Sequence, residues 1–201
     1  KYYNAQVKKA GVKVELGKEA TADLINKAGA DVLILATGSK PASLKIPGID
    51  KKHVTNVFDV LEEKVTLGQK VVILGGNEIA AQTAEWVAQQ GKEVTIIEKG
   101  KAVAYDVNAF NLLAHRRQLA ELKVNILLNV KVEKITDNGV VITTLAGREA
   151  TIAADTVVNA EPFEADKALS DRLKASAAAE IYSIGDCARF RKLYEAIHDG
   201  Y

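Results

Sequence analysis

The stretch "VVILGGNEIA" (residues 71–80) decides how the rest of the sequence is interpreted. A run of apolar residues enters a glycine turn at Gly75 and Gly76, and a helical pattern begins directly after it. This order of strand, turn and helix is the frame of a dinucleotide-binding G-x-G-x-x-G fingerprint. Asn77 and Ala80 stand at the second and third glycine positions of that fingerprint. The stretch therefore indicates a working nucleotide site, a weakened one, or an ordinary strand-to-helix turn.

Each residue of this turn has a separate expected role. Gly75 permits the tight turn, and Gly76 adds backbone freedom. Asn77 is expected to replace glycine in a left-handed conformation, with a side chain that crowds a bound phosphate. Glu78 opens the helix, whose free N–H groups and positive dipole end favour an anion, although its own charge competes with that anion. Gly75, Gly76, Asn77 and Glu78 are thus the predicted cofactor contacts of this turn.

A strand–helix–strand unit surrounds the turn. The apolar segment "KVVIL" (70–74) is followed by a helical pattern over 78–90 and by a second apolar strand, "EVTIIE" (93–98). About thirty residues of this kind form a βαβ crossover with parallel strands. Glu98 ends the second strand, at the position where an acidic residue accepts hydrogen bonds from the adenosine ribose. We expect Glu98 to bind that ribose and to favour NADH over NADPH, with a solvated strand-end carboxylate as the alternative.

The remaining sequence predicts a mixed α/β protein. Helical patterns lie at 21–29 and 108–122, and alternation predicts a strand at 12–16 and a β-meander over 131–154. Continuous apolar runs, which are typical of strands covered on both faces, lie at 32–36, 123–128 and 155–160.

Composition and charge give no reason to expect some classes of partner. The chain has 27 Lys and Arg against 26 Asp and Glu, a net charge of +1, so neither nucleic acid nor an anionic membrane is an expected partner. The single cysteine, Cys187, excludes an intrachain disulfide and fits a cytoplasmic location. His115 is expected on a solvated helix face, with a phosphate or partner contact as the alternative. No spacing of residues predicts a metal site or a catalytic triad. The start at Lys1 inside a helical pattern, without any methionine in the chain, favours a piece of a larger protein.

Three motifs in a fixed order carry a family resemblance. "ATG" (36–38) precedes the glycine turn, and "IGD" (184–186) follows the meander. This order resembles the pyridine nucleotide–disulfide oxidoreductase-like flavoproteins, in which a nicotinamide-nucleotide domain is inserted into an FAD-binding domain. The resemblance implies that Gly38 ends the first FAD segment and that Gly185 and Asp186 contact FAD, with Asp186 on its ribityl chain.

Two longer segments narrow the resemblance. "KITDNGVVIT" (134–143) and "IYSIGDCARFRKLYEAIHDGY" (181–201) are similar to the C-terminal half of NADH:flavin oxidoreductases. That group includes 2-enoate reductase, 2,4-dienoyl-CoA reductase and trimethylamine dehydrogenase. The resemblance implies an N-terminal FMN-binding barrel with a 4Fe-4S cluster as a partner outside this chain. "NAEPF" (159–163) departs from the family's pattern, which has Ala-Leu-Gly followed by Pro.

The sequence thus predicts a Rossmann-like three-layer NAD(H)-binding domain over 67–160, inserted in a partial FAD-binding domain over 1–66 and 161–201. The expected function is an enzyme fragment that binds NADH and passes its hydride to FAD, with electrons moving on to FMN and the iron–sulfur cluster. The isolated chain is expected to be inactive. The alternatives are an ADP-holding or vestigial structural domain and a pure docking module. Neither the catalytic residues nor the organic substrate follow from the sequence.

Overall fold

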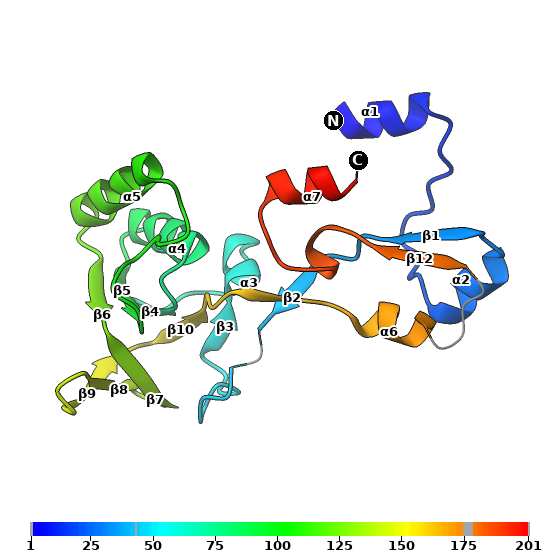
Figure 1. Cartoon of the computed structure of the whole chain (residues 1–201). Coiled ribbons are helices and arrows are strands. Elements are labelled where there is room, and N and C mark those ends of the chain that lie inside the picture. The colour runs from blue at the N-terminus through cyan, green and yellow to red at the C-terminus, as the bar shows by residue number, and fades with distance from the viewer. Residues whose placement is uncertain (1, 43, 175–178, 201) are drawn as a thin grey trace. The chain divides into compact units, whose positions relative to one another are not determined.

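The computed structural model describes residues 2–42, 44–174 and 179–200. The chain forms two compact units, one of residues 1–39 with 165–201 and the other of residues 40–164. Strands β2 (Ser39–Pro41) and β11 (Phe163–Ala165) pair where the chain passes from one unit to the other (Figure 1). The functional domain boundaries at 66/67 and 160/161 differ from this division and stay a prediction.

The larger unit is built on a five-stranded parallel sheet with the order β3-β10-β4-β5-β6. The chain moves from β4 to β5 and β6 on one side, whereas β10 and β3 lie on the other side of β4. The order therefore reverses between β4 and β10, and open α/β sheets bind ligands outside the carboxyl ends of strands at such a switch point. The strands are β3 (Val54–Asn56), β4 (Lys70–Leu74), β5 (Glu93–Glu98), β6 (Asn125–Leu128) and β10 (Thr156–Asn159).

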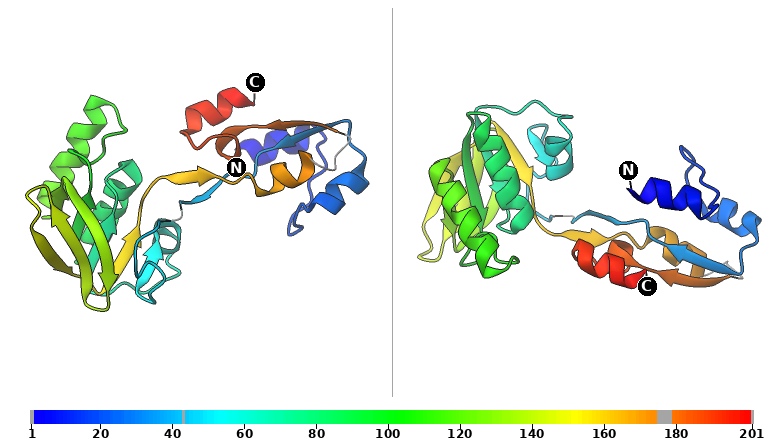
Figure 2. Two further views of the ribbon diagram at one scale, coloured as in Figure 1. Left: turned by 60° about the horizontal axis from the view of Figure 1, so that its bottom comes forward. Right: turned by 90° about the horizontal axis from the view of Figure 1, so that it is seen from above.

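Three layers enclose the core of this unit. Helix α4 (Glu78–Gln89) covers one face of the sheet and contacts β4 and β5, while a β-meander covers the other face (Figure 2). Side chains of the sheet and of the meander share one apolar cluster, which includes Val72, Leu74, Val140 and Val157. Because both faces are covered, Val71 to Leu74 are at most 2% exposed. The meander strands are β7 (Val130–Thr136), β8 (Gly139–Thr144) and β9 (Glu149–Ala153), and the other helices are α3 (Val57–Leu61) and α5 (Ala109–Glu121).

The fold predicted for this unit is confirmed. The βαβ crossover, the third parallel strand and the antiparallel meander all lie where the sequence patterns placed them. In the described part of the chain, none of the helices is long and apolar enough to cross a membrane.

The smaller unit contains a two-stranded parallel sheet of β1 (Val32–Leu35) and β12 (Glu180–Ser183). Leu35, Leu173 and Cys187 form its buried cluster. Helix α2 (Ala22–Ala28) begins after the N-cap Thr21 and ends at the left-handed Gly29, as predicted. The other helical elements are α1 (Tyr2–Lys9), α6 (Ala168–Lys174), η1 (Gly185–Cys187) and α7 (Leu193–Asp199).

Two predictions for the smaller unit are wrong. Strand β1 is not covered on both faces, because Val32 is 51% and Ile34 is 61% exposed. Residues 12–16 do not form a strand, and their apolar side chains Val12, Val14 and Leu16 are exposed. Alternation alone does not make a strand, because the backbone also needs a neighbouring strand with which to pair.

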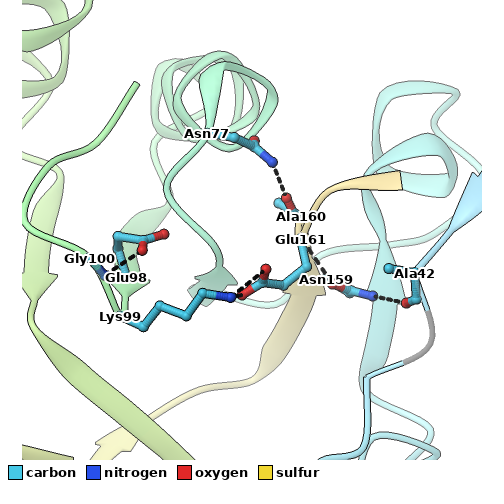
Figure 3. Close-up of polar contacts among 8 residues, drawn as sticks. All are labelled: Ala42, Asn77, Glu98, Lys99, Gly100, Asn159, Ala160 and Glu161. Carbon is cyan, nitrogen blue, oxygen red and sulfur yellow. Dashed lines mark hydrogen bonds and ion pairs between the residues drawn. The ribbon is translucent and has the colours of Figure 1, made fainter. Parts of the chain in front are cut away.

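The turn between β4 and α4 is fixed by Asn77. Its Oδ1 accepts a hydrogen bond from the Ala80 N–H at 2.8 Å. Its Nδ2 donates to the Ala160 carbonyl at 2.8 Å, as Figure 3 shows. Asn77 is an extended N-cap with φ −70°, so the prediction of a left-handed conformation is wrong. The left-handed position is Gly75, with φ +106°, where an added Cβ would lie 3.1 Å from the Ala160 oxygen. One buried amide thus joins the start of α4 to the end of β10.

This double role predicts how costly the loss of Asn77 is. Asn77→Ala is expected to lower the free energy of unfolding by about 2–4 kcal/mol, since the cap contributes about 1 kcal/mol and an unsatisfied buried carbonyl costs about 1–3 kcal/mol. Asn108→Ala, which removes the matching cap bond to the Asn111 N–H on α5, is expected to cost about 1 kcal/mol. Denaturant unfolding followed by circular dichroism compares the two variants. Equal losses would show that the bond to Ala160 adds no stability.

Candidate functional site

The carboxyl edge of the large sheet brings the glycine turn and Glu98 together. Glu98 is 3% exposed, and its Oε1 accepts a hydrogen bond from the Gly100 N–H at 2.5 Å (Figure 3). A Cβ added to Gly76 would lie 2.7 Å from Glu98 Oε2. Gly76 is therefore a glycine because the carboxylate packs against its backbone. The alternative of a solvated strand-end carboxylate at Glu98 is wrong, while its binding of ribose stays a prediction.

The end of β10 supplies a polar rim beside Glu98. The Glu161 N–H donates to Asn159 Oδ1 at 3.0 Å, and Asn159 Nδ2 donates to the Ala42 carbonyl at 3.4 Å. Lys99 Nζ lies 3.2 Å from Glu161 Oε2, as Figure 3 shows. Glu161, which belongs to the segment "NAEPF", thus places its carboxylate beside Lys99. Its negative charge partly offsets the positive charge of Lys99, the residue that follows Glu98.

The loop between β5 and α5 (residues 99–108) runs back over the glycine turn. The Ala104 N–H donates to the Gly76 carbonyl at 2.6 Å, and Ala104 is 1% exposed. Asp106 Oδ1 accepts a hydrogen bond from the Glu78 N–H at 2.7 Å. A carboxylate of this loop therefore accepts from the first backbone donor of α4, the donor predicted to bind a phosphate.

Asp106 and the loop around it were missed in the sequence. A loop without regular structure has no periodic pattern, so spacing alone does not say that it returns to the turn. The only signal is an acidic residue shortly before the N-cap Asn108 of the next helix. That pattern does not distinguish a residue that caps another helix from a solvated one.

The pKa of Tyr105 shows that this edge of the sheet carries negative charge. Partial burial raises the pKa of its hydroxyl. The negative charges of Glu98, Asp106 and Glu161 raise that pKa further. Three carboxylates therefore act on one side chain, and the edge offers a bound phosphate less positive potential than a bare helix N-terminus.

The residue types at this edge are those that a dinucleotide-binding site needs. The glycine turn gives close access to the backbone, the twelve-residue helix α4 presents its N-terminus, and an acidic residue ends the next strand. Binding of a phosphate at this edge depends on one contact, because the Glu78 N–H already donates a hydrogen bond to Asp106. Release of Asp106 would make that donor accessible to a phosphate oxygen.

The residues predicted to contact FAD lie in the smaller unit. Gly38, with φ +80°, follows β1, and Gly185, with φ +62°, follows β12. Asp186 Oδ1 accepts a hydrogen bond from the Arg191 N–H at 3.1 Å, and the Gly185 N–H donates to Asp199 Oδ2 at 2.9 Å. Because β1 and β12 are parallel neighbours, these three predicted residues gather at one edge of the small sheet. Their contacts with FAD stay a prediction.

His115 lies on α5 and faces α4, and its predicted solvated position is wrong. Its Nδ1 is 2.8 Å from Glu85 Oε1, and the two side chains are 14% and 10% exposed. The pair is buried because α5 packs on α4. Among the residues that the structure describes, no group of three or more His, Cys, Asp or Glu side chains could hold a metal ion.

Comparisons with known proteins agree with this architecture. The chain is 35% identical to cinnamate reductase from Clostridium sporogenes over 205 residues, which cover 100% of this chain and 30% of that protein. It is 30% identical to NADH oxidase from Thermoanaerobacter brockii over 209 residues, covering 100% of this chain and 31% of that protein. The structure matches 2-naphthoyl-CoA reductase in complex with 2-naphthoyl-CoA, with a TM-score of 0.93 and 58% identity, over 100% of this chain and 30% of that one.

The chain thus spans about a third or less of the length of these relatives. They support the predicted resemblance to the C-terminal part of the 2-enoate reductase-like flavoproteins, and the predicted Rossmann-like fold is confirmed. The sequence model of the family "Pyridine nucleotide-disulphide oxidoreductase" matches residues 1–200. The chain belongs to the pyridine nucleotide-disulphide oxidoreductase family.

Proposed function

We propose that this chain is the NADH-binding part, and a portion of the FAD-binding part, of a flavin-dependent oxidoreductase. NADH would bind along Gly75 to Glu78, with its adenosine ribose on Glu98. The observation that carries this proposal is the packing of Glu98 against Gly76 at the carboxyl edge, beside the β4–β10 switch point. When bound, NADH supplies a hydride and FAD accepts it, while the protein supplies position and electrostatics.

Each part of the turn would have a distinct task in binding. The Glu78 N–H would donate to the pyrophosphate, since the helix N-terminus favours negative charge. Gly76 would let the ribose-binding carboxylate of Glu98 lie against the backbone of the turn, because Gly76 has no Cβ to displace it. The Glu98 carboxylate would accept hydrogen bonds from the ribose hydroxyls and repel a 2′-phosphate. In the smaller unit, Gly38, Gly185 and Asp186 would hold FAD, with Asp186 on the ribityl chain.

For the whole protein, we propose that electrons move from FAD to FMN and a 4Fe-4S cluster in an N-terminal barrel outside this chain. The share of the relatives that this chain covers, 30% for both cinnamate reductase and 2-naphthoyl-CoA reductase, supports a larger polypeptide. The names of these two relatives support an unsaturated aryl acid or its thioester as the class of organic substrate. The isolated chain would bind nucleotide without turning over that substrate.

Two other functions are tested by the same measurement. The second candidate is an ADP-holding or vestigial domain, and the Asp106 carboxylate on the Glu78 N–H favours its vestigial form because it opposes a bound phosphate. Isothermal titration of the chain with NADH, NADPH and ADP is expected to show binding of NADH and ADP, and weaker binding of NADPH. Binding of ADP without binding of NADH would support an ADP-holding domain. Binding of none of the three nucleotides would support a pure docking module.

Glu98 provides a sharper prediction. Glu98→Gln keeps the size of the side chain against Gly76 but removes its charge, so the preference for NADH over NADPH is expected to narrow about tenfold. Glu93→Gln, at the exposed amino end of the same strand, is the matched control and is expected to leave the ratio unchanged. Competitive titration of each variant with both dinucleotides gives the ratio. A ratio that Glu98→Gln does not change would remove Glu98 from the ribose site.

A further inference from the structure

We propose that Asp106 is an internal competitor for the nucleotide phosphates. In this inference its carboxylate occupies the anion position at the start of α4, and tight binding of a nucleoside diphosphate requires its release. The inference rests on the proposed function, because it concerns the affinity of the same site. Beyond the proposed function, it assigns to Asp106, in the β5–α5 loop, control over the fraction of molecules that can bind nucleotide.

The geometry at the helix N-terminus supports this competition. The first turn of a helix leaves backbone N–H groups without partners inside the helix, and these groups are the donors that bind phosphate. In α4 the Glu78 N–H donates to Asp106 Oδ1 at 2.7 Å, and the Ala80 N–H donates to Asn77 Oδ1 at 2.8 Å. Two of these donors therefore already bind oxygen atoms of the chain. The Asp106 bond is the charged one, and a phosphate oxygen would need the same N–H.

The two contacts differ in how easily they are displaced. Asn77 is 5% exposed and also bonds the Ala160 carbonyl, so it belongs to the framework of the turn. Asp106 is exposed and lies on an irregular loop. The hydrogen bond between the Glu78 N–H and Asp106 is exposed, so water can solvate both groups when they separate and the net free energy of the bond is small. Asp106 can therefore leave the Glu78 N–H without unfolding the turn.

The same loop has a firm anchor close to Asp106. Ala104 is 1% exposed, its N–H bonds the Gly76 carbonyl at 2.6 Å, and its φ of +53° lies in the left-handed region. A non-glycine residue keeps such a conformation only where surrounding contacts hold it. With Ala104 fixed on the glycine turn, Asp106 is kept near the helix N-terminus, and its effective concentration there is high.

Charge makes the competition stronger. Asp106, Glu98 and Glu161 all raise the pKa of the Tyr105 hydroxyl, so their negative charges act on a common region. A diphosphate placed on the Glu78 N–H would meet the Asp106 carboxylate as a like charge. The apparent affinity for a nucleotide is then reduced by the fraction of molecules in which Asp106 has left.

The test measures ADP binding by isothermal titration for the parent chain, Asp106→Asn and Asp106→Ala. Both variants are expected to bind ADP about three- to tenfold more tightly than the parent, because each removes the competing charge at the helix N-terminus. Asp137→Asn is the control, since it removes one negative charge from a side chain that is 84% exposed in the meander turn. It is expected to leave the ADP affinity unchanged.

A second measurement follows the Glu78 amide in the absence of nucleotide. Hydrogen exchange at this amide is expected to be faster in Asp106→Ala than in the parent, while the Ala80 amide keeps its protection. Asp106→Asn retains an oxygen that accepts from the Glu78 N–H. If Asp106→Ala lowers the melting temperature, the effect of the charge on ADP affinity is measured with Asp106→Asn.

The outcomes separate this inference from the proposed function. If the parent binds ADP or NADH and the Asp106 variants bind no more tightly, Asp106 is a structural cap and the inference is wrong, while the nucleotide site stands. Equal tightening by Asp137→Asn would also overturn the inference, because overall charge would then explain the effect. Absence of binding in the parent and in every variant would overturn both.

Discussion

The side chain of Asn77 is the contact on which the candidate site depends most. With one oxygen it caps α4, and with one nitrogen it holds the end of β10, so it joins the two strands between which the sheet order reverses. An amide suits this position because it both accepts and donates, whereas a glycine would do neither. The turn therefore keeps its shape without the second glycine of the fingerprint. The surrounding edge of the sheet, with Gly76 and Glu98, is built on this fixed turn.

Carboxylates of the chain satisfy backbone donors at both predicted cofactor edges. In the larger unit Glu98 accepts from the Gly100 N–H, and Asp106 accepts from the Glu78 N–H. In the smaller unit Asp199 accepts from the Gly185 N–H. Backbone N–H groups that point out of a turn need a partner, and an acidic side chain provides one when no ligand is bound. Such contacts stabilise the free chain and at the same time oppose an anionic ligand.

Much of the fold could be predicted from the sequence because periodicity reports burial. The apolar runs of β4 and β5 are covered on both faces of the sheet, so their sequence pattern was sufficient to predict two buried strands. The strand expected at 12–16 was wrong because its alternation has no neighbouring strand in the described residues. His115 was also misplaced, since its burial depends on the packing of α5 against α4, which a single helix pattern does not contain.

The candidate site was predictable only in part, for a related reason. Gly75, Gly76 and Glu98 follow from the spacing of a strand–helix–strand unit, which the parallel sheet brings to one edge. Asn77 was identified as part of the turn, but its conformation and its bond to Ala160 depend on a strand 83 positions away in the sequence. Asp106 carried no specific signal beyond an acidic residue before the N-cap Asn108, because its role arises from the path of an irregular loop.

We expect nucleotide to bind at the carboxyl edge of the large sheet, around the start of α4. The most direct test of this binding is a titration of the ¹⁵N-labelled chain with ADP, followed by the backbone amide resonances. The resonances of Gly76, Glu78 and Asp106 are expected to shift together in proportion to saturation. Those of Lys70 and Thr156, at the opposite edge of the sheet, are expected not to move. Shifts of Lys70 and Thr156 with the Glu78 resonance unchanged would show that nucleotide does not bind at the start of α4.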